Sequence, residues 1–150
     1  MNVIFFDIDG VLNCGSPSKI DKDKAKLFSD LVTATNSILV LISPYKEGWE
    51  RGKNYTTPEA KYIDKHLLQK GHLRIADKTR EAPNEGKGAG IRKWLNENPD
   101  TEKWIVIDSN YSPDYEDYDI LPNLLSPVVG LTEELVQSAI IMMSEDDNEH

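Results

Sequence analysis

Short apolar runs alternate with amphipathic stretches along the chain. Four runs, at residues 3–6, 38–42, 73–76 and 104–107, have the length of strands and are largely apolar, the third being the weakest. Near-continuous apolar strands are typical of a parallel sheet that is buried on both faces. A further pair of valines, at residues 128–129, predicts a short edge strand.

The stretches between these runs have the spacing of helices. We expect helices at about residues 21–36, 57–71, 88–98 and 132–143. Residues suited to capping stand at three of the starts: Asp21 or Asp23, Thr57 and Thr132. Strands that alternate with helices predict an α/β fold in which helices cover a mainly parallel sheet.

The length of 150 residues fits one domain, and neither an internal repeat nor a dividing linker is evident. We expect a single domain at residues 1–144. Residues 145–150 include four acids among six positions, which predicts a disordered acidic tail.

Charge narrows the range of partners. The chain has 17 Lys and Arg against 26 Asp and Glu, a net charge of −9, which disfavours non-specific nucleic-acid binding and anionic membrane surfaces. No apolar run approaches the roughly 18 residues of a membrane span, and the first residues lack the basic stretch of a signal peptide. The single cysteine, Cys14, cannot form an intramolecular disulfide. We therefore expect a cytoplasmic protein.

Polar residues that carry chemistry follow the predicted strands. Asp7 and Asp9 follow the first, Ser43 the second and Asp108 the fourth, while Lys87 stands where a helix begins. Ligands of open parallel sheets bind beyond the carboxyl ends of the strands. Carboxylates that converge there repel one another unless a cation joins them, and an oxygen-only ligand set suits Mg²⁺. The hydroxyl of Ser43 and the ammonium group of Lys87 can hold a phosphate, and a neighbouring carboxylate can then attack its phosphorus.

These residues resemble the four ordered motifs of the haloacid dehalogenase (HAD) superfamily of phosphohydrolases, over residues 3 to about 143. The most specific part is the opening DIDGVLN at residues 7–13. A closer resemblance is to the HAD domains of Swiss-army-knife RNA-repair proteins, through KGAGIRKWL at residues 87–95 and GLT at residues 130–132. The resemblance implies a three-layer Rossmann-like HAD fold.

The resemblance also implies a role for each site residue. Asp7 is the nucleophile that forms an aspartyl-phosphate, and Asp9 is the general acid and later the base. Ser43 and Lys87 bind the phosphoryl group. Asp7, Asp9 (through its carbonyl) and Asp108 bind Mg²⁺. The implied activity is that of a Mg²⁺-dependent phosphatase, a phosphomonoester hydrolase.

Two positions depart from the family pattern. Ser43 is followed by Pro44, which lacks a backbone donor. Asp108 is followed by Ser109 where a second acid is usual, and Asp114 is the candidate replacement in the metal shell. Without a second acid, the alternative function is a HAD-fold binding or regulatory module with little or no turnover. Phosphotransfer to an acceptor other than water also stays open.

No separate cap domain is expected. The gaps from Asp9 to Ser43 and from Ser43 to Lys87 each hold one predicted helix and one predicted strand. An uncapped site suits a phosphorylated macromolecular end, or a small phosphorylated molecule covered by loops or by a second subunit of an oligomer. The candidate covering loops are at residues 14–20, 45–55 and 111–118.

Overall fold

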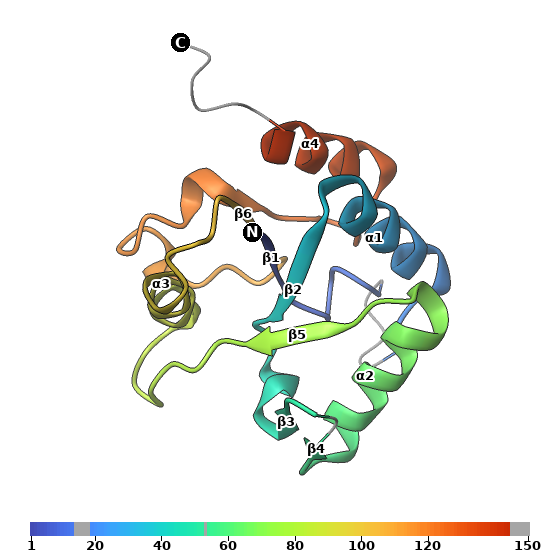
Figure 1. Cartoon of the computed structure of the whole chain (residues 1–150), viewed down its shortest axis with the longest axis horizontal. Coiled ribbons are helices and arrows are strands. Elements are labelled where there is room, and N and C mark those ends of the chain that lie inside the picture. Colours follow the sequence, from blue (N-terminus) through green and yellow to red (C-terminus); the bar gives the residue numbers. More distant parts are fainter. Residues whose placement is uncertain (14–18, 53, 145–150) are drawn as a thin grey trace.

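A five-stranded parallel sheet forms the centre of the computed structural model, which describes residues 1–13, 19–52 and 54–144 (Figure 1). Its strands are β1 (Asn2–Phe6), β2 (Ser37–Leu41), β5 (Ile75–Lys78), β6 (Lys103–Ile107) and β7 (Leu124–Leu125). Their order across the sheet is β5-β2-β1-β6-β7, and all four neighbouring pairs are parallel. The predicted α/β architecture with a mainly parallel sheet is confirmed.

The strand register brings the strand ends together. Phe6, the last residue of β1, pairs with Leu41 at the end of β2 and with Ile107 at the end of β6. Because the three strands stop side by side, the residues that follow them emerge at one edge of the sheet. This edge holds the candidate site.

Helices cover both faces of the sheet. They are α1 (Lys22–Thr35), α2 (Pro58–Gly71), α3 (Lys87–Glu97) and α4 (Glu133–Ser144). Phe6 packs on Phe28 of α1, with ring centroids 5.1 Å apart, on the face that α1, α2 and α4 share. Its neighbour Phe5 points to the opposite face and meets Trp94 of α3 edge to face at 5.4 Å. Successive strand residues thus supply two separate cores, and the fold has the predicted three layers (Figure 1).

The predicted helix caps are present. Asp21 accepts hydrogen bonds from the first-turn amides of α1, Thr57 accepts one from Ala60, and Thr132 accepts one from Leu135. Each side-chain oxygen satisfies a backbone N–H group that the helix itself leaves without an acceptor.

The predicted edge strand at residues 128–129 is wrong. Leu124–Leu125 takes the edge position instead, directly after a short 3₁₀ helix, Leu121–Asn123. Val128 and Val129 lie beyond Pro127 in a loop and are 96% and 62% exposed. Proline cannot donate to a strand ladder, so pairing stops before it.

The third strand lies two residues later than predicted, at Ile75–Lys78. Its last two residues are charged but buried, because Asp77 pairs with Arg51 at 2.7 Å and Lys78 with Glu50 at 3.0 Å. The partners come from a small hairpin that the sequence did not predict, β3 (Trp49–Glu50) and β4 (Asn54–Tyr55), which follows a 3₁₀ helix at Pro44–Gly48.

The described segments between the strands of the sheet contain no separate cap domain, as predicted. Among the described helices, none combines the length and apolar character that crossing a bilayer requires. Cys14 and the predicted tail at residues 145–150 lie outside the described residues.

Candidate active site

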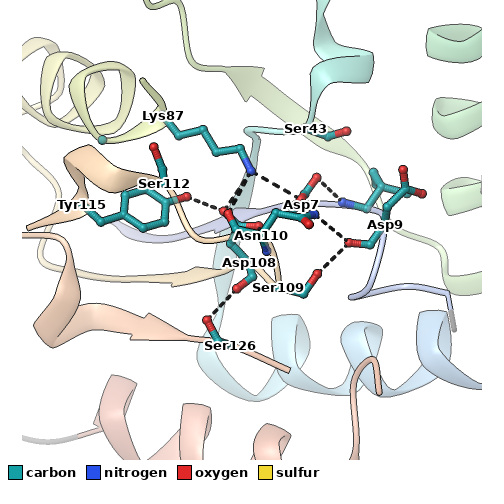
Figure 2. A network of polar contacts seen from close by, with 12 residues as sticks. Asp7, Asp9, Ser43, Lys87, Asp108, Ser109, Asn110, Ser112, Tyr115 and Ser126 are labelled. Carbon is teal, nitrogen blue, oxygen red and sulfur yellow. Dashed lines mark hydrogen bonds and ion pairs between the residues drawn. The ribbon is translucent and has the colours of Figure 1, made fainter. Parts of the chain in front are cut away.

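Four predicted site residues meet at the carboxyl edge of the sheet (Figure 2). Asp7 follows β1, Asp108 follows β6, and both side chains are almost fully buried. Lys87 is the first residue of α3 and reaches over the sheet edge toward both carboxylates. Asp9 lies two residues beyond Asp7, in the turn that leaves β1.

Lys87 is the shared counter-ion of the two buried carboxylates. Its Nζ lies 3.0 Å from Asp108 Oδ2 and 3.6 Å from Asp7 Oδ2. Burial, and to a lesser degree the neighbouring Asp108, raise the pKa of Asp7 above its usual value, although Lys87 and Asn110 favour the charged form. The site is therefore short of positive charge, even with the lysine in place.

Asn110 joins the two acids of the opening motif to the strand end at Asp108. Its side-chain Nδ2 lies 3.0 Å from Asp7 Oδ2 and 3.4 Å from the carbonyl oxygen of Asp9, while its backbone N–H donates to Asp108 Oδ1. The oxygens of Asp7 and Asp9 thus face a common point. The sequence prediction missed Asn110, although its position two residues after Asp108 was a usable signal.

Ser109 braces the turn after β1. Its hydroxyl donates to the carbonyl oxygen of Asp9 at 2.9 Å. A Cβ atom on Gly10 would collide with the Ser109 hydroxyl, and Gly10 has a φ of +81°. Only glycine suits this position, because it alone combines that backbone conformation with the close approach.

Two side chains hold the carboxylate of Asp9. Asn13 donates to Oδ1 at 2.9 Å and the Tyr45 hydroxyl donates to Oδ2 at 3.0 Å. Asn13 also accepts from the backbone N–H of Gly10, which closes the turn on itself. Burial and the charge of Asp9 raise the pKa of Tyr45, so this phenol stays a donor at neutral pH. Tyr45 was predicted only as part of a covering loop.

Ser43 lies at the same edge but contacts other groups. Its buried hydroxyl accepts from the backbone N–H of Tyr45 at 3.2 Å and has no described bond to the carboxylates. Figure 2 places it beside Asp7, on the side away from Asp108.

Tyr115 lies in the predicted covering loop at residues 111–118 but points into the protein. Its side chain is fully buried and donates to Asp108 Oδ2 at 2.5 Å. Burial and the charge of Asp108 raise the pKa of this phenol. Asp108 Oδ2 therefore accepts from Tyr115 and Lys87 together.

Asp114 faces α3 rather than the carboxylates. Its Oδ1 accepts from the Gly88 amide and the Ser112 hydroxyl, and its Oδ2 accepts from the Ala89 amide. Burial alone would raise the pKa of Asp114, but these hydrogen bonds outweigh it and lower the pKa below its usual value. A Cβ on Gly86 would lie 2.6 Å from the carboxylate. The expected metal-shell residue is instead the N-terminal cap of the helix that carries Lys87.

The donor set that remains suits a hard cation. Two carboxylates, Asp7 and Asp108, lie with the carbonyl oxygen of Asp9 and the carboxamide of Asn110. No group of three His, Cys, Asp or Glu side chains gathers as a metal site in the described residues. Mg²⁺ also accepts backbone carbonyl and side-chain amide oxygens as ligands. The residues present therefore fit Mg²⁺ in chemistry.

Residues 3–136 match the family model described as the HAD domain in Swiss Army Knife RNA repair proteins. The chain belongs to this family. The predicted HAD superfamily membership and the closer resemblance to these RNA-repair domains are both confirmed. Residues 3–136 therefore form a HAD domain.

A solved structure agrees with this assignment of the fold. The D,D-heptose 1,7-bisphosphate phosphatase from B. bronchiseptica, crystallised with magnesium and phosphate, matches with a TM-score of 0.52 and 16% identity. The match covers 97% of this chain and 100% of that one. At this identity the likeness bears on the HAD fold alone. A search of curated protein sequences finds no match.

Proposed function

We propose that the chain is a Mg²⁺-dependent phosphomonoesterase that works through Asp7. The observation that carries the proposal is the convergence of oxygens at one edge of the sheet: Asp7 Oδ2 and the Asp9 carbonyl both face Asn110 Nδ2, and Lys87 lies between Asp7 and Asp108. Oxygens arranged around common points, with too little positive charge among them, suit a divalent cation and a phosphoryl group.

The residues that would hold Mg²⁺ are Asp7, Asp108, the carbonyl of Asp9 and Asn110. When bound there, Mg²⁺ offsets negative charge on the phosphoryl oxygens. Asn110 takes the place of the second acid of the family pattern, because a half-turn of its carboxamide presents oxygen instead of nitrogen. Asp114 is left out of this set, since both its oxygens accept hydrogen bonds at α3.

Asp7 has one oxygen available for attack. Its Oδ2 faces Asn110 and Lys87, whereas Oδ1 accepts only the Ile8 amide, at 2.8 Å, among the described contacts. In the first step Oδ1 bonds to phosphorus and the bond from phosphorus to the leaving oxygen breaks. Asp9 gives its proton to that oxygen. Lys87 and the hydroxyl of Ser43 hold the phosphoryl oxygens.

The second step returns the enzyme to its starting state. Water attacks phosphorus, Asp9 takes a proton from that water, and the bond between Asp7 and phosphorus breaks. Phosphate leaves and Asp9 is protonated for the next cycle. An acceptor alcohol in place of water would give phosphotransfer by the same atoms.

The substrate is a phosphorylated small molecule or macromolecular end. The family description refers to RNA repair, so a phosphorylated RNA end is one candidate. A net charge of −9 disfavours non-specific nucleic-acid binding, and such an end would be held mainly by its phosphate.

A binding or regulatory module with little turnover is the second candidate. Its support is that the buried acids already have partners within the chain: Asp108 has Lys87 and Tyr115, and Asp7 has Asn110. A site satisfied in this way can hold its shape without metal or turnover.

Hydrolysis of p-nitrophenyl phosphate with Mg²⁺ and with a chelator tests the proposal. We expect hydrolysis in the presence of Mg²⁺ and none in the presence of the chelator. Asp7→Asn should abolish the hydrolysis without changing the circular dichroism spectrum. Asp30→Asn, on the exposed surface of α1, is the matched control and should behave like the wild type. Phosphate binding without turnover of any phosphoester would instead support the binding module.

A further inference from the structure

A pocket of about 210 Å³ opens beside Asp9, between the 3₁₀ helix at Pro44–Gly48 and α2. It is lined by Ile8, Tyr45, Pro58, Glu59, Tyr62 and Ile63. Two tyrosine rings, two isoleucines and a proline make the lining largely apolar. Glu59 is the one charged residue among these six.

The pocket touches the proposed general acid through Tyr45. The ring of Tyr45 forms part of the wall, and its hydroxyl donates to Asp9 Oδ2 at 3.0 Å. The oxygen that receives a proton from Asp9 must therefore lie near the mouth of the pocket. The rest of the leaving group has this apolar space beside it.

The ring of Tyr62 also lines the pocket, and its orientation is fixed by two contacts. Its hydroxyl accepts from the Ile20 amide at 3.4 Å, and its ring stacks on His66 of the same helix, with centroids 4.0 Å apart and a 35° tilt. Tyr45 and Tyr62 are both only half-buried. Each ring thus exposes an aromatic surface that is already oriented, so binding a ligand against it costs little side-chain entropy.

We propose that this pocket binds the leaving group of the substrate, and that this group carries a flat, uncharged ring. The inference rests on the proposed function. Apolar and aromatic walls favour a ring, and the carboxylate of Glu59 disfavours an anionic one. The volume is below that of sites for whole drug-sized ligands, so one ring system fits. Aryl and nucleoside phosphates share this chemistry.

Paired ligands that differ only in the ring test the pocket. Uridine 5′-monophosphate and ribose 5-phosphate carry the same ester, and phenyl phosphate adds an aryl arm. Calorimetric binding to Asp7→Asn protein with Mg²⁺ does not depend on turnover. We expect the uridine compound to bind about tenfold more tightly than ribose 5-phosphate, a typical gain from stacking one base. Tighter binding of phenyl phosphate alone would identify an aryl source for the ring.

Tyr62→Leu keeps an apolar wall but removes the ring, and should reduce that preference to near unity. Tyr62→Phe removes only the hydroxyl and should retain it. Tyr118→Leu, a tyrosine 37% exposed and away from the pocket, is the matched control. Equal binding of the ring-bearing and ring-free ligands, or a preference that survives Tyr62→Leu, overturns the pocket assignment. Ring-dependent binding without hydrolysis of any ester would overturn the phosphatase and keep the pocket.

Discussion

Asn110 donates a hydrogen bond to Asp7 across 3.0 Å, although the two residues are 103 positions apart in the chain. The contact joins the end of β6 to the end of β1 through an uncharged side chain. In the family pattern an acid is usual near Asp108, so this chain has one negative charge fewer at the proposed metal site.

Replacing Asn110 should change Mg²⁺ affinity in a direction that depends on the new side chain. We expect Asn110→Ala to weaken Mg²⁺ binding about tenfold, because it removes both the proposed carboxamide ligand and the hydrogen bond that orients Asp7. Asn110→Asp should strengthen it by adding charge. Calorimetry, or electron paramagnetic resonance with Mn²⁺, measures the affinity without requiring turnover.

The control for these variants is Asn96→Ala, on the exposed side of α3. It should bind Mg²⁺ like the wild type. Equal affinities for wild type, Asn110→Ala and Asn110→Asp would remove Asn110 from the metal shell.

The cap at α3 predicts a pH-dependent loss of stability. Asp114→Ala should lower the free energy of unfolding at pH 7 by about 1–2 kcal/mol, as removal of an N-terminal cap does. The folded protein holds the pKa of Asp114 below its usual value. The stabilisation is therefore complete at pH values above the pKa that Asp114 has in the unfolded chain. It is lost as the pH falls through the lower pKa that Asp114 has in the folded protein.

Urea unfolding of wild type and Asp114→Ala between pH 7 and pH 3 measures this effect. The gap between the two proteins should narrow toward the acid end. Asp117→Ala, on the exposed part of the same loop, should cost little at either pH. A gap that stays constant across the range would contradict the assigned cap.

The hydroxyl of Tyr115 should contribute to stability separately from its buried ring. Tyr115→Phe keeps the buried ring but removes the donor to Asp108, which should cost about 1–3 kcal/mol in the free energy of unfolding. Tyr111→Phe, at a ring 57% exposed, is the matched comparison and should be nearly neutral. Equal unfolding midpoints for the two variants would show that Asp108 does not need this donor.

Tyr45 should act by positioning Asp9. Tyr45→Phe removes the hydrogen bond to Oδ2 but keeps the pocket wall. An acid matters most for leaving groups that are poor without protonation. We therefore expect kcat to fall about tenfold for alkyl phosphates and much less for p-nitrophenyl phosphate. A merely structural role would lower both rates alike.

Local sequence was enough to predict the architecture. The apolar run that contains Phe5 and Phe6 has the length and character of a strand in a doubly covered sheet, and Thr57 and Thr132 stand where helices begin. The site residues at the strand ends followed from topology, because parallel strands bring their carboxyl ends to one edge. The structure brings Asp7, Lys87 and Asp108 into contact there.

The missed features depend on distant partners. Asp114 contacts Gly88, 26 residues away. The neighbouring sequence does not distinguish an acid that faces a metal from one that faces helix amides, because both positions favour a negative charge. Tyr115 lies in a run of acids typical of solvated loops, and only its contact with Asp108 explains its burial. Asp77 and Lys78 likewise enter a strand because a distant hairpin neutralises them.

The central place of β1 has a consequence for how Asp7, the proposed nucleophile, behaves over time. Its neighbours β2 and β6 pair with both of its edges, and the Asp7 amide continues the ladder by donating to the Ile107 carbonyl at 3.0 Å. Strands in such positions open last in native proteins, often only on global unfolding. Asp7 should thus keep its orientation while surface loops open, so that the proposed attack on phosphorus needs no ordering of this side chain beyond what folding has already supplied.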